Sequence, residues 1–259
     1  MKILILGASS GFGREFVKKL CNDNEIIAIS NEKQGLLNLK KEIKDKYNRD
    51  IKTDCKDLRI EKDINYLCET YKDIDFLINS AGTGKIGNIA EVSYKDEKSI
   101  IDLNVIGFYT ITKRFSLEMM KRRQGFIINV CSTASFIPMP NFAIYAATKA
   151  FAASYTIALM KELKNHNVKI MALCPGTTNT NFLDEEYFEH IRKKMGKNAI
   201  YMYPDRIVKK ALIKFKCGKR IYIPRFRDKI IYYGDKLLPI SFTTNIIYNL
   251  FEHIKRREQ

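Results

Sequence analysis

The sequence lacks the features that mark membrane-spanning and secreted proteins. No stretch of the 259 residues approaches the ~20 continuous apolar residues that a spanning helix needs. The apolar run after Met1 and Lys2 stops at Gly7, so no secretory signal is predicted. We therefore expect a cytoplasmic protein. Because no internal repeat or low-complexity linker divides the chain, we expect one domain over residues 1–259.

Metal-binding and disulfide patterns are also missing. The six cysteines are scattered without a C-x-x-C pair, and the three histidines lie far apart. We therefore expect no metal site and interpret the cysteines as buried free thiols. Cys131 and Cys174 end apolar runs that are typical of strands. No helix-turn-helix or zinc-finger pattern is present, which argues against nucleic-acid binding.

Positive charge is concentrated at one end of the chain. The net charge is +16, and residues 192–259 hold 18 Lys and Arg against 5 Asp and Glu. Within this part, residues 224–259 combine Lys and Arg with Ile, Leu, Phe and Tyr in amphipathic patterns. Such a segment fits a helix packed on its own domain, a flap over an apolar substrate, or a subunit contact. It also fits a peripheral contact with the anionic inner surface of a membrane.

Short apolar runs alternate with helical patterns along most of the chain. Strands are predicted at 2–6, 25–30, 51–53, 74–78, 126–130, 168–173 and 220–224. A polar helix ends near Tyr47, another spans 58–71, and long helical patterns cover 99–123 and the residues from Tyr145 to Asn165. This alternation predicts an α/β fold with a doubly wound parallel sheet. Ligands of such sheets bind outside the carboxyl ends of the strands, where Gly7, Asp54 and Asn79 are expected.

A glycine-rich turn follows the first predicted strand. Gly7, Gly11 and Gly13 lie between that strand and a helical segment ending near Leu20. Glycines allow the backbone to approach a pyrophosphate, and the helix N-terminus supplies N–H groups and a positive dipole end. The turn therefore predicts a nucleotide site, although the spacing is G-x-x-x-G-x-G rather than G-x-G-x-x-G.

Tyr145 and Lys149 are four residues apart in a helical pattern, which places them on one helix face. A neighbouring ammonium favours the phenolate and lowers the pKa of the phenol, so Tyr145 is a candidate proton donor. The alternative is a half-buried Tyr beside a solvated Lys.

Two further polar residues lie at candidate positions. Ser132 follows a predicted strand. Asn104 lies inside the long helix, where it either bonds a neighbouring backbone group or bends the helix to hold a water.

Together these features resemble the short-chain dehydrogenase/reductase family, in its branch of about 250 residues. The resemblance covers residues 2 to about 180. It rests on the glycine turn, Asp54, Asn79-Ser-Ala-Gly82, the tetrad Asn104, Ser132, Tyr145 and Lys149, and Pro175-Gly176 with Thr180. It implies a Rossmann-type sheet of about seven strands in the order 3-2-1-4-5-6-7, with helices on both faces.

The resemblance also implies a reaction, namely hydride transfer between a nicotinamide cofactor and a carbonyl or alcohol. Tyr145 would be the general acid or base, Lys149 would lower its pKa, Ser132 would hold the substrate oxygen, and Asn104 would hold a relay water. The implied cofactor-binding residues are Gly7, Ser9, Ser10, Gly11, Phe12, Gly13, Asn31, Lys33, Asp54, Cys55, Asn79, Ala81, Gly82, Tyr145, Lys149, Pro175, Gly176, Thr178 and Thr180.

The residues after the second strand bear on cofactor choice. NAD-specific members usually carry an acidic residue there for the ribose 2′-OH, and NADP-specific members carry Arg or Lys. This chain has Ser30, Asn31, Glu32 and Lys33. Asn31 and Lys33 are suited to a 2′-phosphate, while Glu32 opposes it, so NADP(H) is favoured over NAD(H). Leu6 and Ser80 also depart from the family pattern, at supporting positions.

The substrate is expected to be a small, partly apolar carbonyl compound or alcohol. Residues 181–203 are predicted to form a lid rich in aromatic and aliphatic side chains, with the segment 224–259 beside it. A homodimer or homotetramer is expected. Two alternatives remain open: a sugar-nucleotide-modifying enzyme of the longer family branch, and a non-catalytic protein that senses dinucleotides or binds nucleic acid or membranes.

Overall fold

The computed structural model describes residues 1–178, 202–234 and 239–255. Most of the predicted lid at 181–203, and Thr180 before it, therefore lie outside the described residues. Among the described residues, no helix is both long enough and apolar enough to cross a bilayer. Within the same ranges, no group of three or more potential metal ligands comes together.

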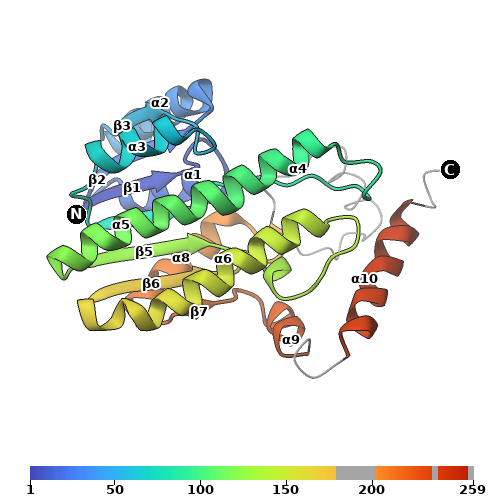
Figure 1. The fold of residues 1–259 in the computed structure, drawn as a ribbon. Helices are drawn as coiled ribbons and strands as arrows, with labels where there is room; N and C mark the ends of the chain where they lie inside the picture. The colour runs from blue at the N-terminus through green and yellow to red at the C-terminus, as the bar shows by residue number, and fades with distance from the viewer. Residues whose placement is uncertain (179–201, 235–238, 256–259) are drawn as a thin grey trace.

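Seven parallel strands form one sheet in the order β3-β2-β1-β4-β5-β6-β7, which confirms the predicted order (Figure 1). The apolar runs suit strands that are buried on both faces. The strands are β1 Lys2–Leu6, β2 Glu25–Ser30, β3 Lys52–Cys55, β4 Phe76–Asn79, β5 Gly125–Val130, β6 Val168–Leu173 and β7 Ile221–Tyr222. The third strand continues two residues beyond the predicted one, and the seventh is shorter than predicted.

Helices cover both faces of the sheet, as predicted. One face packs on α1 Gly11–Leu20, α2 Lys33–Tyr47 and α8 Pro204–Lys216, and the other on α3 Glu61–Thr70, α5 Phe108–Arg122 and α6 Ala143–Glu162. Because side chains alternate along a strand, Ile3 and Ile5 of β1 join the first core, whereas Leu4 and Leu6 join the second. In Figure 1, α5 and α6 lie in front of the sheet.

The long helix predicted over 99–123 is interrupted at Asn104. Helix α4 begins at Tyr94 and ends at Ile101, after Ser93 caps its N-terminus by accepting a hydrogen bond from the Asp96 amide. A π-helical segment at Asp102–Gly107 joins α4 to α5. The helix is therefore locally widened at Asn104, a feature that often occurs at functional sites; of the two alternatives for Asn104, the bend that holds a water stays a prediction.

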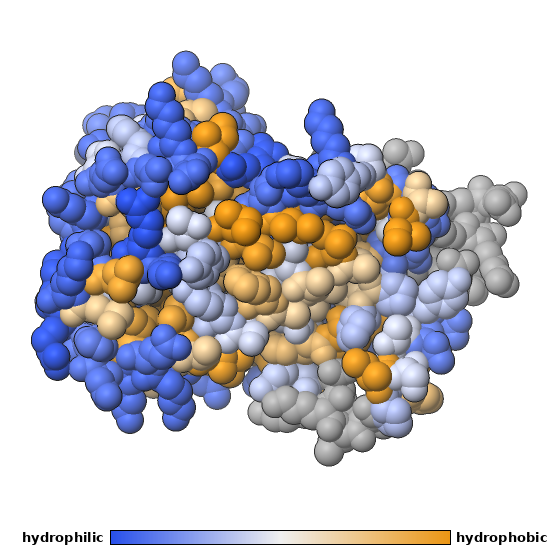
Figure 2. All heavy atoms as spheres, viewed as in Figure 1, coloured by the Kyte–Doolittle hydropathy of each residue, from blue (hydrophilic) through white to orange (hydrophobic). Residues whose placement is uncertain are grey.

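Exposed apolar side chains gather on two surfaces. Figure 2 shows apolar residues across the middle of the face formed by α5 and α6. The exposed apolar side chains of these two helices include Leu117 and Phe151, which are 45 and 38% exposed. The C-terminal helices α9 Phe226–Gly234 and α10 Ile240–Lys255 expose Phe226 and Phe242 among others. The expected homo-oligomer contact and the expected peripheral membrane contact stay predictions.

All six cysteines lie in the described ranges and are free thiols. Four are buried as predicted, but Cys55 and Cys217 are exposed. The reason is their place in the fold: Cys55 ends the edge strand β3, and Cys217 follows the last residue of α8.

Candidate active site

A cavity of about 360 Å³ lies at the carboxyl ends of the central strands. It runs from the glycine turn to the residues around Tyr145. Fourteen of the predicted site residues line it: Gly7, Ser9, Ser10, Gly11, Phe12, Asn31, Ala81, Gly82, Ser132, Tyr145, Lys149, Pro175, Gly176 and Thr178. Six others that the structure describes are not on its wall: Gly13, Lys33, Asp54, Cys55, Asn79 and Asn104.

The glycine turn has the geometry of an anion site. Gly7 and Gly11 have φ values of +70° and +49°, which glycine adopts without strain. A Cβ on Gly7 would lie 2.8 Å from the Ala81 backbone nitrogen. A Cβ on Gly13 would overlap the Gly7 carbonyl oxygen, so Gly13 serves close packing of the turn rather than the cavity wall. The N-terminus of α1, which has no acidic residue in its first turn, therefore faces the cavity and suits a phosphate group.

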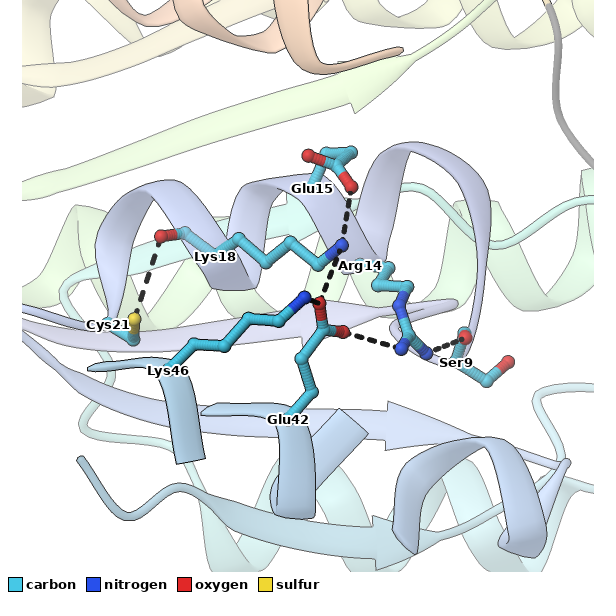
Figure 3. Close-up of polar contacts among 7 residues, drawn as sticks. All are labelled: Ser9, Arg14, Glu15, Lys18, Cys21, Glu42 and Lys46. Carbon is cyan, nitrogen blue, oxygen red and sulfur yellow. Dashed lines mark hydrogen bonds and ion pairs between the residues drawn. The ribbon is translucent and has the colours of Figure 1, made fainter. Parts of the chain in front are cut away.

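A charged cluster behind the turn holds α1 against α2 (Figure 3). Glu42 of α2 accepts ion pairs from Arg14 at 2.5 Å, Lys46 at 2.9 Å and Lys18 at 3.3 Å. Burial alone would raise the pKa of Glu42, but the three cations lower it to about 2. Arg14 also donates to the Ser9 carbonyl oxygen at 3.3 Å, which couples the cluster to the glycine turn.

Asn79 supports the site from behind rather than lining it. Its side chain is 1% exposed and donates to the Phe108 carbonyl oxygen at 3.5 Å and to Thr112 Oγ1 at 3.3 Å, both on α5. The cavity wall is formed instead by the next residues, Ser80 and Ala81. Because successive residues of a strand point to opposite faces, the last residue of β4 turns into the core beside α5.

Two residues expected at the far end of the cavity, Asp54 and Cys55, do not line it, and their contact with a cofactor stays a prediction. Asp54 still belongs to β3, where its carboxylate accepts from the Tyr71 hydroxyl at 3.5 Å. Cys55 is exposed, and its thiol donates to the Asn31 carbonyl oxygen at 3.6 Å. Asp57 and Leu58 line the cavity three positions later. The missed signal was the helix start: α3 begins at Glu61 rather than at Leu58, so the turn after β3 is longer than expected.

Tyr145 and Lys149 are both buried, with exposures of 9 and 5%. Their ring centroid and ammonium nitrogen are 5.8 Å apart, and Lys149 Nζ donates to the Val130 carbonyl oxygen at 3.1 Å. The Tyr145 ring stacks on Phe142 with centroids 4.3 Å apart. Lys149 is therefore not a solvated surface lysine, which excludes the alternative considered from the sequence.

Burial dominates the proton equilibria of this pair. It raises the pKa of Tyr145 to about 12, although a hydrogen bond with the Ser132 side chain acts to lower it. Burial also lowers the pKa of Lys149. The expectation that Lys149 lowers the pKa of Tyr145 is thus not met in this structure, because both groups are desolvated together.

Ser132 begins a short turn beside Tyr145. Its backbone is extended, and its hydroxyl accepts from the Ala134 amide at 3.1 Å, which caps the 3₁₀ turn Thr133–Ser135. Because this bond fixes the side chain, the hydroxyl stays on the cavity wall within reach of Tyr145.

Asn104 lies behind the cavity wall in the π-helical segment and is 2% exposed. Its amide accepts from the Thr83 backbone nitrogen at 3.0 Å and donates to the Thr83 carbonyl oxygen at 2.8 Å and to Thr148 Oγ1 at 3.1 Å. A Cβ on Gly82 would lie 3.3 Å from Asn104 Oδ1 and 3.2 Å from Lys149 Nζ. Asn104 therefore positions the segment over Lys149, and its role in holding a water stays a prediction.

Other residues on the cavity wall have no counterpart in the sequence prediction. They include Ser30 and Lys56 at the far end, Thr83 and Leu103 in the middle, and Cys131, Ala134, Met139 and Phe142 around Tyr145. Met139 and Phe142 were detectable only as apolar residues near Tyr145, since no motif distinguishes them from core residues.

Comparisons with known proteins agree with this fold. The chain is 29% identical over 219 residues to the NADP-dependent 3-hydroxy acid dehydrogenase YdfG of Salmonella typhi, covering 80% of this chain and 86% of that protein. A short-chain dehydrogenase from Sphingobium yanoikuyae, solved with NADPH, superposes with a TM-score of 0.79 at 22% identity over 90% of this chain and 91% of that one. One from Burkholderia phymatum, solved with NAD, gives 0.76 at 20% identity over 86% and 88%.

The family comparison decides the assignment. The model of the family described as short chain dehydrogenase matches residues 1–190, which include the glycine turn, Ser132, Tyr145, Lys149 and the loop at Pro175. The chain therefore belongs to the short-chain dehydrogenase family of NAD(P)-dependent oxidoreductases.

Proposed function

We propose that this enzyme reduces a partly apolar carbonyl compound with a nicotinamide dinucleotide, preferring NADP(H). The observation that carries the proposal is one cavity lined by the glycine turn, which suits a phosphate, at one end and by Ser132, Tyr145 and Lys149 at the other. The cavity wall suits a dinucleotide at Gly7, where a Cβ would lie 2.8 Å from the Ala81 backbone and glycine lets a ligand approach the chain closely. When bound, the cofactor supplies the hydride.

The protein's part is to hold and protonate the carbonyl oxygen. The pKa of Tyr145, raised to about 12 by burial, keeps the phenol protonated near neutral pH, so it is poised as a proton donor. The Ser132 hydroxyl stands beside it and would share the charge that develops on the oxygen. Lys149, held on the Val130 carbonyl, would orient the cofactor ribose next to Tyr145. These roles favour the direction of reduction.

The wall around Tyr145 supports an apolar substrate. Ala134, Met139 and Phe142 line the cavity there, and Phe142 lies flat on the Tyr145 ring. Apolar walls with a few fixed polar groups are typical of small-molecule sites. The carbonyl would therefore meet Ser132 and Tyr145 while its carbon skeleton contacts these side chains.

Lys56, rather than Lys33, supports the proposed preference for NADP(H). Lys33 and Glu32 are absent from the cavity wall, whereas Ser30, Asn31 and Lys56 are on it. The Lys56 ammonium lies 4.3 Å from the centre of the Tyr66 ring and 3.6 Å from the Asp63 carboxylate, so it is held against α3. A lysine in this place suits a ribose 2′-phosphate. The NADP-dependent relative is in line with this choice.

Titration calorimetry with NADP⁺ and NAD⁺ tests the cofactor preference. We expect tighter binding of NADP⁺, and we expect Lys56→Ala to weaken it about tenfold, the equivalent of ~1.4 kcal/mol, without changing NAD⁺ binding. Lys33→Ala is the matched control and should change neither, because Lys33 is off the cavity wall. Tighter binding of NAD⁺ to the unmodified protein would overturn the preference.

The reaction itself is tested by following the oxidation of NADPH and NADH by absorbance over a panel of aliphatic, aromatic and sugar-nucleotide carbonyl compounds. We expect turnover on apolar ketones or aldehydes. Dinucleotide binding without turnover on any member would favour the sensing alternative. Turnover confined to sugar nucleotides would favour the other enzyme branch.

A further inference from the structure

Two buried cysteines that the proposed reaction does not use lie beside Lys149. Cys131 follows the last residue of β5 and directly precedes Ser132, and Cys174 follows β6 and directly precedes Pro175. They are 2 and 0% exposed. Each thiol is therefore one residue away from a segment that forms the active-site wall.

The backbone places the two cysteines side by side. Strands β5 and β6 are parallel, with Val130 opposite Leu173 at their ends, and the ladder continues because the Cys131 amide donates to the Leu173 carbonyl oxygen at 2.7 Å. Neighbouring strands lie about 4.7–4.9 Å apart, inside the Cα separation of roughly 4.4–6.8 Å that disulfides use. Both side chains belong to the same core cluster, on the α5 and α6 side of the sheet.

The two thiols are also chemically unequal. The Cys131 thiol donates to the Asn129 carbonyl oxygen at 3.7 Å. The neighbouring Cys174 side chain and the Lys149 ammonium lower the pKa of Cys131 against the effect of burial, whereas the pKa of Cys174 is raised. Cys131 is one of the residues that line the cavity and is 2% exposed, so the cavity is the side from which a small oxidant would approach it. By contrast, burial raises the pKa of Cys68 to about 11, far from the cavity. A cation-stabilised thiol next to a second thiol is the arrangement of redox-sensitive pairs.

We propose that Cys131 and Cys174 are an oxidation site, and that hydrogen peroxide entering the cavity joins them in a reversible disulfide. The Cys131 thiolate attacks one peroxide oxygen; the S–O bond forms, the O–O bond breaks and hydroxide leaves. The Cys174 sulfur then attacks the Cys131 sulfur; the S–S bond forms, the S–O bond breaks, and the thiol proton leaves with the oxygen as water. The two thiols lose two electrons, and the peroxide is reduced to two waters.

The disulfide alters the active site through its neighbours. An S–S bond of about 2.05 Å requires the two sulfurs to move together, and both thiols influence the Lys149 ammonium electrostatically. The Val130 carbonyl, which holds Lys149 Nζ, and Ser132 are the residues adjacent to Cys131 in the chain. Oxidation is therefore expected to abolish carbonyl reduction until dithiothreitol restores the thiols; this consequence, unlike the bond itself, rests on the proposed function.

Peptide mass spectrometry of the full chain tests the bond without any activity assay. After brief peroxide treatment, alkylation and non-reducing digestion, we expect a peptide pair linked through Cys131 and Cys174, about 2 Da lighter than its free thiols. Cys68→Ser, a change at another buried cysteine, should leave this link intact. Full alkylation of Cys131 and Cys174 while the exposed Cys55 and Cys217 are oxidised would overturn the proposal.

The order of the two steps is tested with Cys174→Ser. This variant keeps the attacking thiol, so we expect dimedone to label a sulfenic acid at Cys131 and no linked peptide to form. An unlabelled Cys131 in a variant with an unchanged circular dichroism spectrum would contradict the assignment of Cys131 as the attacking thiol. If the link forms but turnover is unaffected, the bond stands and its effect on the proposed reaction does not.

Discussion

Replacing Tyr145 by Phe is expected to lower carbonyl turnover by about 10²–10⁴-fold, the usual contribution of a positioned general acid. The substitution removes only the hydroxyl that hydrogen-bonds with Ser132. The ring, and with it the stacking on Phe142 at 4.3 Å, remains. Dinucleotide affinity should therefore stay within a few-fold of the original. The measurements are kcat for NADPH oxidation on a substrate found in the carbonyl panel and calorimetric titration of the cofactor.

Tyr155→Phe is the matched control, because Tyr155 lies on the same helix and is also a partly buried tyrosine whose pKa burial raises to about 12. It packs on Tyr109 and Phe151, away from the cavity wall, so its loss should leave turnover unchanged. Near-normal turnover of Tyr145→Phe, or equal losses in both variants, would contradict the role of Tyr145.

The pH dependence follows from the same phenol. A proton donor with a pKa near 12 is fully protonated at neutral pH and loses its proton only as the pH rises toward that value. Ionisation of Tyr145 should therefore not change the rate of carbonyl reduction between about pH 6 and 9. A lower pKa of Tyr145 would instead produce a decline within that range.

The sheet was predictable because each apolar run is followed by a turn and a helical pattern, and buried parallel strands require such runs. The strand order, in contrast, depended on the family resemblance. The ends of the edge strands were predicted poorly: β3 has the burial pattern of a half-exposed strand, so its polar residues carry no apolar signal that marks where it stops. As a result, the residues that line the cavity there are Asp57 and Leu58, three positions after the predicted Asp54 and Cys55.

Within the site, residues fixed by local geometry were predicted and those fixed by packing were not. Tyr145 and Lys149 share a helix face, so their spacing alone placed them together. Whether Asn79 and Asn104 face the cavity depends on α5 and on Thr83, which lie distant in sequence, and both amides turn out to be held behind the wall. Lys56 was missed in the sequence for the same reason. Its ammonium is held by Tyr66 and Asp63 of α3, and no sequence motif indicates these contacts.

Gly13→Ala is expected to abolish measurable dinucleotide binding and to lower the free energy of unfolding by about 1–3 kcal/mol, the usual cost of overpacking. The added methyl group would overlap the Gly7 carbonyl oxygen and lie 2.8 Å from Ser80 Oγ. A hydroxyl can rotate away, but a backbone carbonyl cannot, so α1 and the glycine turn must separate. That separation withdraws the helix N-terminus from the place where it meets a phosphate.

Gly218→Ala separates this effect from the general cost of replacing a glycine. No atom lies within 4 Å of the Cβ position at Gly218, although its φ of +79° makes Ala strained there. We expect a loss of about 1 kcal/mol from backbone strain and unchanged cofactor affinity, measured by urea denaturation and calorimetry. If Gly13→Ala bound the cofactor as tightly as Gly218→Ala, the turn would be able to rearrange, and the close packing of Gly13 on Gly7 would not be what holds the phosphate site open.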